Sequence, residues 1–554
     1  MLRFLRINIS ILVVSLFAGC LTNLIAEPDL YIRTNQVGFL PGDIKTGIIL
    51  SGKSLETKKF EVINAANNKV EFSSVITGNL GRYGNFPFTY EIDFSKIVVI
   101  GKYYISVEGI RSYEFRVSYK AYTGIADQLL EFFKVQRCGY TDPELHKVCH
   151  RFDATSLIDG KKTINEKVDL TGGWHDAGDY TKFLNTTAYS TYMLLFAYEF
   201  DPVKFGFDNN KNGAPDILEE AKVGLDWLLR ANYSKYELVT QVQDLRDHDV
   251  GWRLPENDVL ANDRPAFIGI GKNLIGIYCA AMSLAARIWR DKFNYPGYAE
   301  KCLTAAENLY SIRKSVPDID SSGTGSYIDN RFYGKMALGA VELYLTTNRA
   351  EFLRDAKVYA DSAGSDYWWS WGNFNSLADY RLAKFDIKYA DYIKNNLTAF
   401  EKNRNEDIFG KGTSLSWGTN NTLLGITVQN ILWQRLTGDG SFNKVALYQR
   451  DYILGRNPWG VSFIYKTGTN YSINFHHQVS YFNGGNLPGG FAAGPATREF
   501  LKKFKIPYEK PDKYAKFQDE GAVYRDDRMD YITNEPTITA NATAIFVMGF
   551  YSQR

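Results

Sequence analysis

The sequence predicts a small β-sandwich followed by a large all-α domain. From about residue 30 to residue 118, short β-rich runs are separated by Gly, Pro, Asn or Asp, as sandwich strands are. From residue 119 onward, apolar residues recur at helical spacing without strand patterns between the helical runs. This change of period predicts a domain boundary near residue 119.

The composition is that of an ordinary globular protein, and it excludes one class of partner. The 554 residues are enough for a large core and more than one domain. With 64 basic and 62 acidic residues the net charge is +2, which gives no electrostatic basis for binding nucleic acid. Aromatic residues make up 15% of the chain and suit either a packed core or the flat faces of sugar rings.

The first 20 residues predict an export signal, in which Arg3 and Arg6 precede a short apolar run. That run is too short to span a membrane as a mature helix. The segment 17–20 resembles a bacterial lipobox, in which Cys20 would carry the lipid, but Phe17 replaces the usual Leu and leaves plain secretion open. We expect an exported protein that is secreted, periplasmic or lipid-anchored at the cell envelope.

The two folded domains are expected at residues 28–118 and 119–554. Strands of the first are predicted at 31–33, 46–50, 59–63, 88–92 and 101–107. Helices of the second are predicted at 121–135, 186–200, 214–232, 272–290, 298–313, 330–347, 350–362, 386–403, 421–437, 443–454 and 537–551. Helix pairs that close into a toroid would place their loops at one end, as a natural binding face.

The loop 172–180 concentrates reactive groups. It places Asp176 and Asp179 three residues apart, next to His175. Its three glycines argue against a helix interior and for a tight, shaped loop. The alternative interpretation is a solvated acidic turn.

A second acidic segment lies before the last predicted helix. Glu535 precedes Pro536, which suits a first helical turn. A general acid needs a raised pKa, which burial or neighbouring carboxylates provide, and Asp526, Asp527 and Asp530 lie close in sequence. The alternative is a segment that only caps the helix.

Cys138, Cys149, His150 and His175 form a complete tetrahedral zinc set. Four protein ligands leave no open position, so this zinc would be structural. His146 is a rival for the fourth position, and in an exported protein a Cys138–Cys149 disulfide is the alternative.

A possible calcium loop spans 208–216, where Asp208, Asn210, Asn212 and Asp216 place oxygen side chains around Gly213. A turn that opens the next helix at Pro215 is an equally good interpretation.

Taken together, these motifs resemble glycoside hydrolase family 9, in the subgroup with an N-terminal immunoglobulin-like domain. The matching blocks are residues 34–41, 172–179, 212–221 and 452–458, and the acid signature Tyr524, Asp526, Tyr531, Glu535, Thr537, Asn541 and Ala542. The resemblance covers essentially the whole mature chain.

The resemblance implies an (α/α)6 barrel that hydrolyses β-1,4-glucosidic bonds with inversion and without a catalytic cofactor. By position, Asp179 would be the general base, Asp176 would help to hold the attacking water, and Glu535 would be the general acid. Inversion requires two carboxyl groups on opposite faces of the sugar. The resemblance also implies the Cys/Cys/His/His zinc and calcium sites.

One motif departs from the family pattern. The usual Pro-His-x-Arg is replaced by Phe475-His476-His477-Gln478, and Gln478 offers neither the charge nor the fork of an arginine. The substrate-binding candidates are His476, Gln478, Tyr531, Trp252 and Asp526. Trp368, Trp369 and Trp371 are further candidates for sugar stacking.

The leading hypothesis is therefore an exported endo-β-1,4-glucanase that acts on a β-glucan. An exo-acting β-glucosidase or glucosaminidase on the same scaffold is one alternative. A carbohydrate-binding protein that has lost catalysis is another, but the retained Asp176, Asp179 and Glu535 argue against it.

Overall fold

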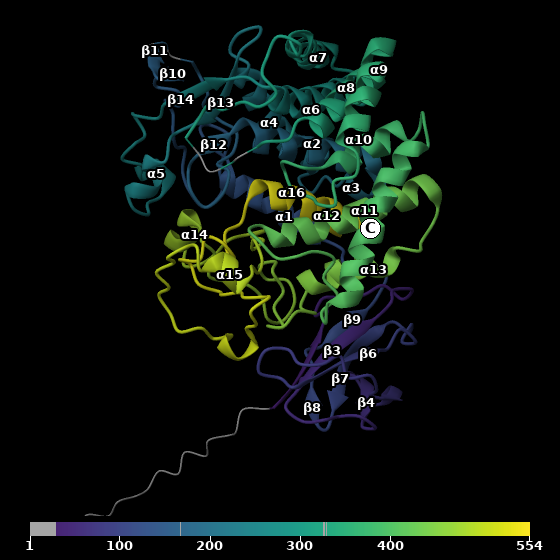
Figure 1. The fold of residues 1–554 in the computed structure, drawn as a ribbon. Helices are drawn as coiled ribbons and strands as arrows, with labels where there is room; N and C mark the ends of the chain where they lie inside the picture. Colours follow the sequence, from purple (N-terminus) through teal and green to yellow (C-terminus); the bar gives the residue numbers. More distant parts are fainter. Residues whose placement is uncertain (1–28, 165, 167, 325–326, 328, 554) are drawn as a thin grey trace, which may run out of the picture.

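The computed structural model describes residues 29–553, apart from 165, 167, 325, 326 and 328. Figure 1 shows the β domain below the much larger helical domain. The predicted export signal and Cys20 lie outside the described residues. Within the described ranges, no helix combines the length and apolar character needed to cross a membrane.

The N-terminal domain is a sandwich of two sheets, as the sequence predicts. One sheet has the order β1 (Leu30–Thr34), β3 (Thr46–Ser51), β6 (Phe88–Asp93). The other has the order β2 (Gly38–Phe39), β9 (Phe115–Val117), β7 (Gly101–Val107), β4 (Lys59–Asn64), β5 (Val70–Val75), with β8 (Ile110–Arg111) on β7. Apolar side chains of the two sheets, such as Ile49 and Ile105, pack into one core. The edge strand β5 was not predicted; it is almost wholly exposed and its polar and apolar residues do not alternate regularly.

The helical domain is an (α/α)6 barrel, which confirms the predicted fold class. Its inner helices bury nearly every residue, and each contacts the next until α16 meets α2 and closes the ring. In order they are α2 (Leu184–Phe200), α6 (Lys272–Asp291), α8 (Tyr333–Thr347), α10 (Asn375–Leu382), α12 (Thr419–Thr437) and α16 (Ile538–Tyr551). The outer helices alternate with them along the chain: α1 (Ile125–Gln136), α4 (Asp216–Ala231), α7 (Pro296–Ser311), α9 (Ala350–Ala363), α11 (Lys388–Glu406) and α13 (Asn443–Ile453).

The inner helix α10 was not predicted. It is buried on all sides although half of its residues are polar or charged, among them Asp379 and Arg381, so it carries no apolar period. The short helices α3 (Pro202–Phe205), α5 (Arg246–Asp249), α14 (Gln478–Phe482) and α15 (Arg498–Leu501) and the 3₁₀ turns η1 (Pro255–Asn257) and η2 (Ala515–Phe517) were also missed. Segments of one turn are too short to show a helical period.

The expectation that the helical domain has no strands is wrong. A five-stranded sheet has the order β11 (Lys162–Ile164), β10 (Leu157–Asp159), β14 (Ala266–Gly269), β13 (Leu238–Val242), β12 (Lys182–Phe183). Its strands are short, and apart from the local hairpin of β10 and β11 they come from distant loops, so periodicity does not mark them. Strand β12 directly follows the loop 172–180 and pairs antiparallel with β13, which anchors the loop at its C-terminal end.

The two domains are joined by buried hydrogen bonds between residues 33–36 and residues 451–460. Asn35 Nδ2 donates to Asp451 Oδ1 at 2.8 Å, and Gln36 Nε2 donates to the carbonyl of Gly460 at 2.7 Å. Arg33 Nε donates to the carbonyl of Pro458 at 2.8 Å. The N–H of Gln36 also donates to the carbonyl of Leu454 at 2.9 Å, so the motif that opens the β domain and the block 452–458 form the two sides of one interface.

Candidate active site

The two acidic motifs meet at the end of the barrel where the inner helices begin. The N–H of Gly178 donates to Glu535 Oε1 at 3.1 Å, and the N–H of Ile538 donates to the carbonyl of Asp176 at 3.0 Å. The last helix begins at Ile538, with Thr537 as its N-cap. The expectation that Pro536 occupies the first helical turn is therefore wrong, and Glu535 lies in the preceding loop.

Asp179 is held in the ionised state. Thr181 donates to Asp179 Oδ1 from its hydroxyl at 2.6 Å and from its N–H at 3.0 Å. His248, on α5, lies with Nε2 2.8 Å from Asp179 Oδ2, and its side chain is 52% exposed. Burial opposes ionisation, but His248 and Thr181 outweigh it, so the pKa of Asp179 is lowered. The hydrogen bond to Asp179 in turn raises the pKa of His248 to about 9.

Glu535 has the opposite character. Burial, and then the negative charge of Asp179, raise its pKa well above the usual value, against the hydrogen bond from Gly178. Two neighbouring carboxyl groups whose pKa values are pushed apart are the signature of an acid and a base. At a pH between the two pKa values, Glu535 is protonated while Asp179 is ionised.

Asp176 is buried, and its charge acts on Glu535. The hydroxyl of Tyr327 donates to Asp176 Oδ2, and Tyr327 packs against Trp371 with ring centroids 5.4 Å apart. Burial, chiefly, raises the pKa of Asp176 to about 6. Trp371, one of the predicted stacking candidates, therefore lies close to the carboxylates, whereas Trp369 is wholly buried in the barrel and hydrogen-bonded to Tyr189.

Aromatic rings line one side of the site. His476 packs edge-on against Trp252 at 5.1 Å and lies 5.8 Å from Tyr531, between ring centroids. Tyr531 in turn contacts the half-exposed Trp417. His476 Nδ1 lies 2.7 Å from the carbonyl of Arg528, which can only accept, so a neutral His476 ring has Nε2 as its acceptor. Three of the five predicted substrate-binding residues, His476, Tyr531 and Trp252, are thus brought together.

The other two have carboxylate or amide oxygens that are occupied within the protein. Gln478 Oε1 accepts from the N–H of Arg253 at 3.0 Å. Asp526 Oδ1 accepts from the N–H groups of Ile473 and Asn474 at 3.1 and 2.8 Å, and Asp526 Oδ2 pairs with Lys513 at 2.7 Å. These contacts fix the loop that carries His476, and they occupy at least one acceptor position on each of those oxygens.

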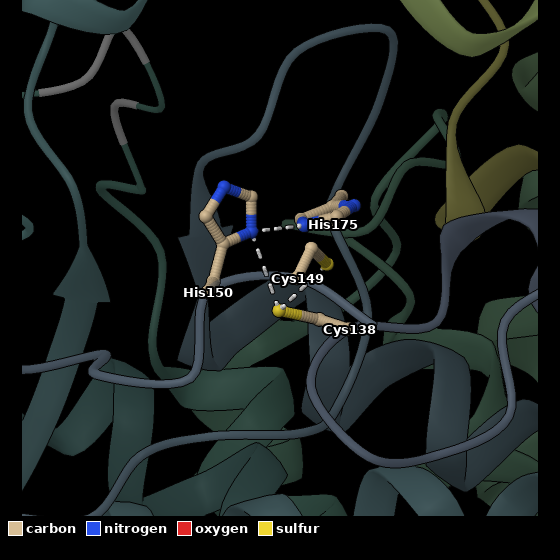
Figure 2. Close-up of side chains that lie close together, drawn as sticks. All are labelled: Cys138, Cys149, His150 and His175. Atoms are coloured by element: carbon tan, nitrogen blue, oxygen red, sulfur yellow. Dashed lines mark hydrogen bonds between the residues drawn. The ribbon is translucent and has the colours of Figure 1, made fainter. Parts of the chain in front are cut away.

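The four predicted zinc ligands form one buried cluster (Figure 2). Cys138 Sγ lies 3.9 Å from Cys149 Sγ and 3.6 Å from His150 Nδ1, and His150 Nδ1 lies 3.0 Å from His175 Nε2. A tetrahedral zinc ion, with bonds of about 2.3 Å to sulfur and about 2.0–2.1 Å to nitrogen, holds its ligand atoms roughly 3.3–3.8 Å apart. The cluster fits such an ion.

The chemistry of the donors agrees with this geometry. Burial opposes ionisation of Cys138, but the Cys149 thiol and the charge of Lys182 outweigh it and hold the pKa of Cys138 well below its usual value. Burial lowers the pKa of His175 to about 4, so its ring is neutral. His150 uses its other nitrogen, Nε2, to contact Asp258 at 3.0 Å, an arrangement that orients metal-binding histidines.

The alternatives for this cluster do not fit. All four cysteines in the described part of the chain are free, and the 3.9 Å between the sulfurs of Cys138 and Cys149 is far from a disulfide bond. Both ring nitrogens of His146 lie about 3 Å from backbone carbonyls, those of Lys147 and Val135. His146 is therefore not the fourth ligand.

The loop 208–216 is closed by its own hydrogen bonds. Asp208 accepts from the N–H groups of Asn212 and Gly213, at 3.1 and 2.8 Å, and Asp216 accepts from that of Asn209. The side-chain amides of Asn210 and Asn212 donate to Glu219. This is the geometry of the predicted turn, and calcium binding stays a prediction.

Two residues of the site were missed by sequence reasoning. The sequence shows His248 between two acidic residues, in the run Asp247-His248-Asp249. No spacing rule connects this run with Asp179. Tyr327 lies in a loop 151 residues from Asp176, and nothing in its local sequence marks it. Both reach the carboxylates only because the barrel closes.

Comparison with known families covers both domains. The sequence model of "Glycosyl hydrolase family 9" matches residues 122–548. That of the "Cellulase N-terminal ig-like domain" matches residues 27–112. Together they account for nearly all of the described chain.

Individual relatives agree with this assignment. Endoglucanase D of Acetivibrio thermocellus is 28% identical, over 84% of this chain and 79% of the relative. The xyloglucan-specific endo-beta-1,4-glucanase BoGH9A of Bacteroides ovatus is 24% identical, over 96% and 95%. The crystal structure of a metagenome-derived glycoside hydrolase family 9 endoglucanase superimposes with a TM-score of 0.81 at 26% identity, over 95% of this chain and 99% of that one.

Proposed function

Because the chain belongs to glycosyl hydrolase family 9, we propose that it is an endo-β-1,4-glucanase that cleaves its substrate with inversion. One observation supports the division of labour: the pKa of Glu535 is raised and that of Asp179 is lowered. At a pH between the two pKa values, the first carboxyl group can give a proton while the second can take one.

In the proposed reaction, Glu535 protonates the glycosidic oxygen as the bond from that oxygen to C1 breaks. Water attacks C1 from the opposite face and gives its proton to Asp179, while Asp176 holds the water in place. Glu535 ends as a carboxylate and Asp179 as a carboxylic acid, and proton exchange with solvent restores both. The aromatic side formed by Trp252, His476 and Tyr531 offers stacking surfaces for the sugar rings.

The test is hydrolysis of soluble β-1,4-glucans, followed by reducing-end release and by NMR of the first product. We expect new reducing ends of the α configuration, because inversion converts the β bond. The absence of sugar release from every β-glucan and β-glucoside tested would refute the hydrolase proposal. Initial formation of the β anomer would refute inversion alone.

An exo-acting enzyme is the second candidate. A cellulose 1,4-beta-cellobiosidase of Acetivibrio thermocellus is 24% identical over 95% of this chain, so relatives with a different product pattern share this scaffold. The loss of the family arginine at Gln478 also alters the substrate side of the site. Viscosity that falls faster than reducing ends appear supports endo action, whereas an early single short product supports exo action.

We further propose that Cys138, Cys149, His150 and His175 hold a structural zinc ion. With four protein ligands the ion has no open position, so it would supply rigidity and no chemistry to the reaction. His175 directly precedes Asp176, and fixing its ring would therefore fix the start of the catalytic loop. A calcium ion at Asp208, Asn210, Asn212 and Asp216 is a separate proposal, tested by calcium-dependent thermal stability.

We also propose export, with lipid attachment at Cys20. The supporting observation is the segment that ends at Cys20, with its charged start and short apolar run. Labelling with an alkyne fatty acid in the producing cell should mark the wild-type protein and not Cys20→Ala. Signal cleavage without label would leave export but refute the lipid anchor.

A further inference from the structure

Gln136, the last residue of α1, makes an unusual set of contacts with the catalytic loop. Its carbonyl accepts from the N–H of His175 at 2.8 Å. Its side-chain Nε2 donates to the carbonyls of His175, at 3.1 Å, and Ala177. Gln136 is 1% exposed. Loss of its amide would therefore leave these buried carbonyls without a hydrogen-bond donor, which is costly.

His477 decides which way this amide points. The N–H of Ser480 donates to His477 Nδ1 at 3.2 Å, so the ring proton is on Nε2, which donates to Gln136 Oε1 at 2.7 Å. Burial lowers the pKa of His477 to about 3, which keeps the ring neutral. With Oε1 engaged in this way, the NH₂ group of Gln136 faces the two loop carbonyls.

The contacts join three distant parts of the chain at the reacting groups. The loop 175–179 carries Asp176 and Asp179, and its Gly178 N–H holds Glu535. The N–H of Gln478, next to His477, donates to the carbonyl of Gly178 at 3.1 Å. The backbone of this loop is therefore held both by the last residue of α1 and by the turn that contains residues 476–478.

We propose that Gln136 and His477 are a positioning pair that sets the distance and angle between the water-side carboxylates and Glu535. The proposal rests on the hydrolase function proposed above. It is separate from zinc, because the metal cluster holds the ring of His175 while Gln136 holds the backbone of residues 175–177. Both residues are about 1% exposed, so both act through the loop.

The first test is Gln136→Met, which keeps the length of the side chain but removes its hydrogen bonds. Gln449 on α13 is a matched control: it is buried, its Nε2 donates to the carbonyls of Gly410 and Val445, both at 2.9 Å, and its Oε1 accepts from Gly412. We expect both variants to lose thermal stability. Only Gln136→Met should lower kcat, by about 10- to 100-fold, with KM nearly unchanged and with wild-type metal content.

The second readout is the pH profile of kcat. When the loop relaxes, the Gly178 N–H no longer stabilises the Glu535 carboxylate, so the pKa of Glu535 rises further. The alkaline limb of Gln136→Met should therefore move to higher pH, while Gln449→Met keeps the wild-type profile. A merely structural role would leave this limb in place.

The third readout uses His477, and it stands if Gln136→Met fails to fold. In His477→Gln an amide can still donate to Gln136 Oε1, whereas in His477→Met nothing can, so His477→Gln should retain much more of kcat. Equal kcat in these two variants, or a wild-type kcat in a folded Gln136→Met, overturns the proposal. If the wild-type protein is inactive on every glucan, the proposed hydrolase function fails and this inference fails with it. If the wild-type protein is active but the variants behave as just described, only the inference fails.

Discussion

The N–H of Gly178 donates a 3.1 Å hydrogen bond to Oε1 of Glu535, across 357 positions of the sequence. The donor is next to Asp179, so the bond ties the residue with the raised pKa to the loop of the residue with the lowered pKa. The geometry between acid and base therefore depends on the backbone of residues 175–178 rather than on a direct contact between their side chains.

The roles of Asp179 and Glu535 predict different responses to the leaving group. Asp179→Ala should lose about 10²- to 10⁴-fold in kcat on all substrates, because a general base contributes about that much. Glu535→Ala should lose as much on glucans but much less on a dinitrophenyl glycoside, whose phenolate departs without a proton. Steady-state kinetics on both substrate types measure this. Equal losses on both would contradict the assignment of Glu535 as the acid.

The contact between His248 and Asp179 predicts a shift of the acid limb of the pH profile. His248 lowers the pKa of Asp179, so its removal raises that pKa, and activity is then lost at a higher pH as the solution is acidified. His248→Gln, which keeps a hydrogen bond but loses the charge, should shift the limb less than His248→Ala. Arg246→Gln on the same short helix is the control, because Arg246 pairs with Asp244 and Asp263. An unmoved limb in His248→Ala would refute the electrostatic role.

The hydroxyl of Tyr327 predicts a defect in kcat. Tyr327→Phe removes the donor to Asp176 and should lower kcat by about 10- to 100-fold, since hydrogen bonds to charged groups are worth about 1.5–3 kcal/mol. Tyr192→Phe is a matched control, because the Tyr192 hydroxyl also donates to a buried carboxylate, Glu342 Oε1, at 2.8 Å deeper in the barrel. That variant should lose stability but keep kcat. Wild-type kcat in Tyr327→Phe would show that the contact does not position Asp176.

The metal cluster predicts about one zinc per chain by elemental analysis. Cys149→Ser should lose the metal and several degrees of thermal stability, because the ion would join Cys138 and Cys149 to His150 and His175 in one buried cluster. Cys279→Ser is the control: Cys279 is also a buried free thiol, but it lies in α6, and its variant should keep the zinc. A purified wild-type protein with no zinc, or one with Cys138 and Cys149 disulfide-linked, would refute the site.

The fold could be predicted where a segment buries one face. The outer helices α4 and α9 have one apolar face each, and their predicted bounds differ from the observed ones by only a few residues. Helix α10 has no such face because it is surrounded, and the strands β12, β13 and β14 are paired only through contacts between distant segments. Neither leaves a local pattern, and so both were missed.

The candidate site divides in the same way. The carboxylates, the cysteines and the histidines lie in motifs whose residue types indicate acid–base chemistry and metal binding. The sequence alone therefore identified Asp176, Asp179 and Glu535 as candidate catalytic residues and four side chains as candidate metal ligands. Only the tertiary structure decided their states and partners. Closure of the barrel brings His248 and Tyr327 to the carboxylates. It also engages Gln478 and Asp526 in hydrogen bonds within the protein and places Gln136 against the backbone of the loop. The pKa of a carboxyl group depends on its burial and on the charges around it, and these exist only once distant segments have packed together.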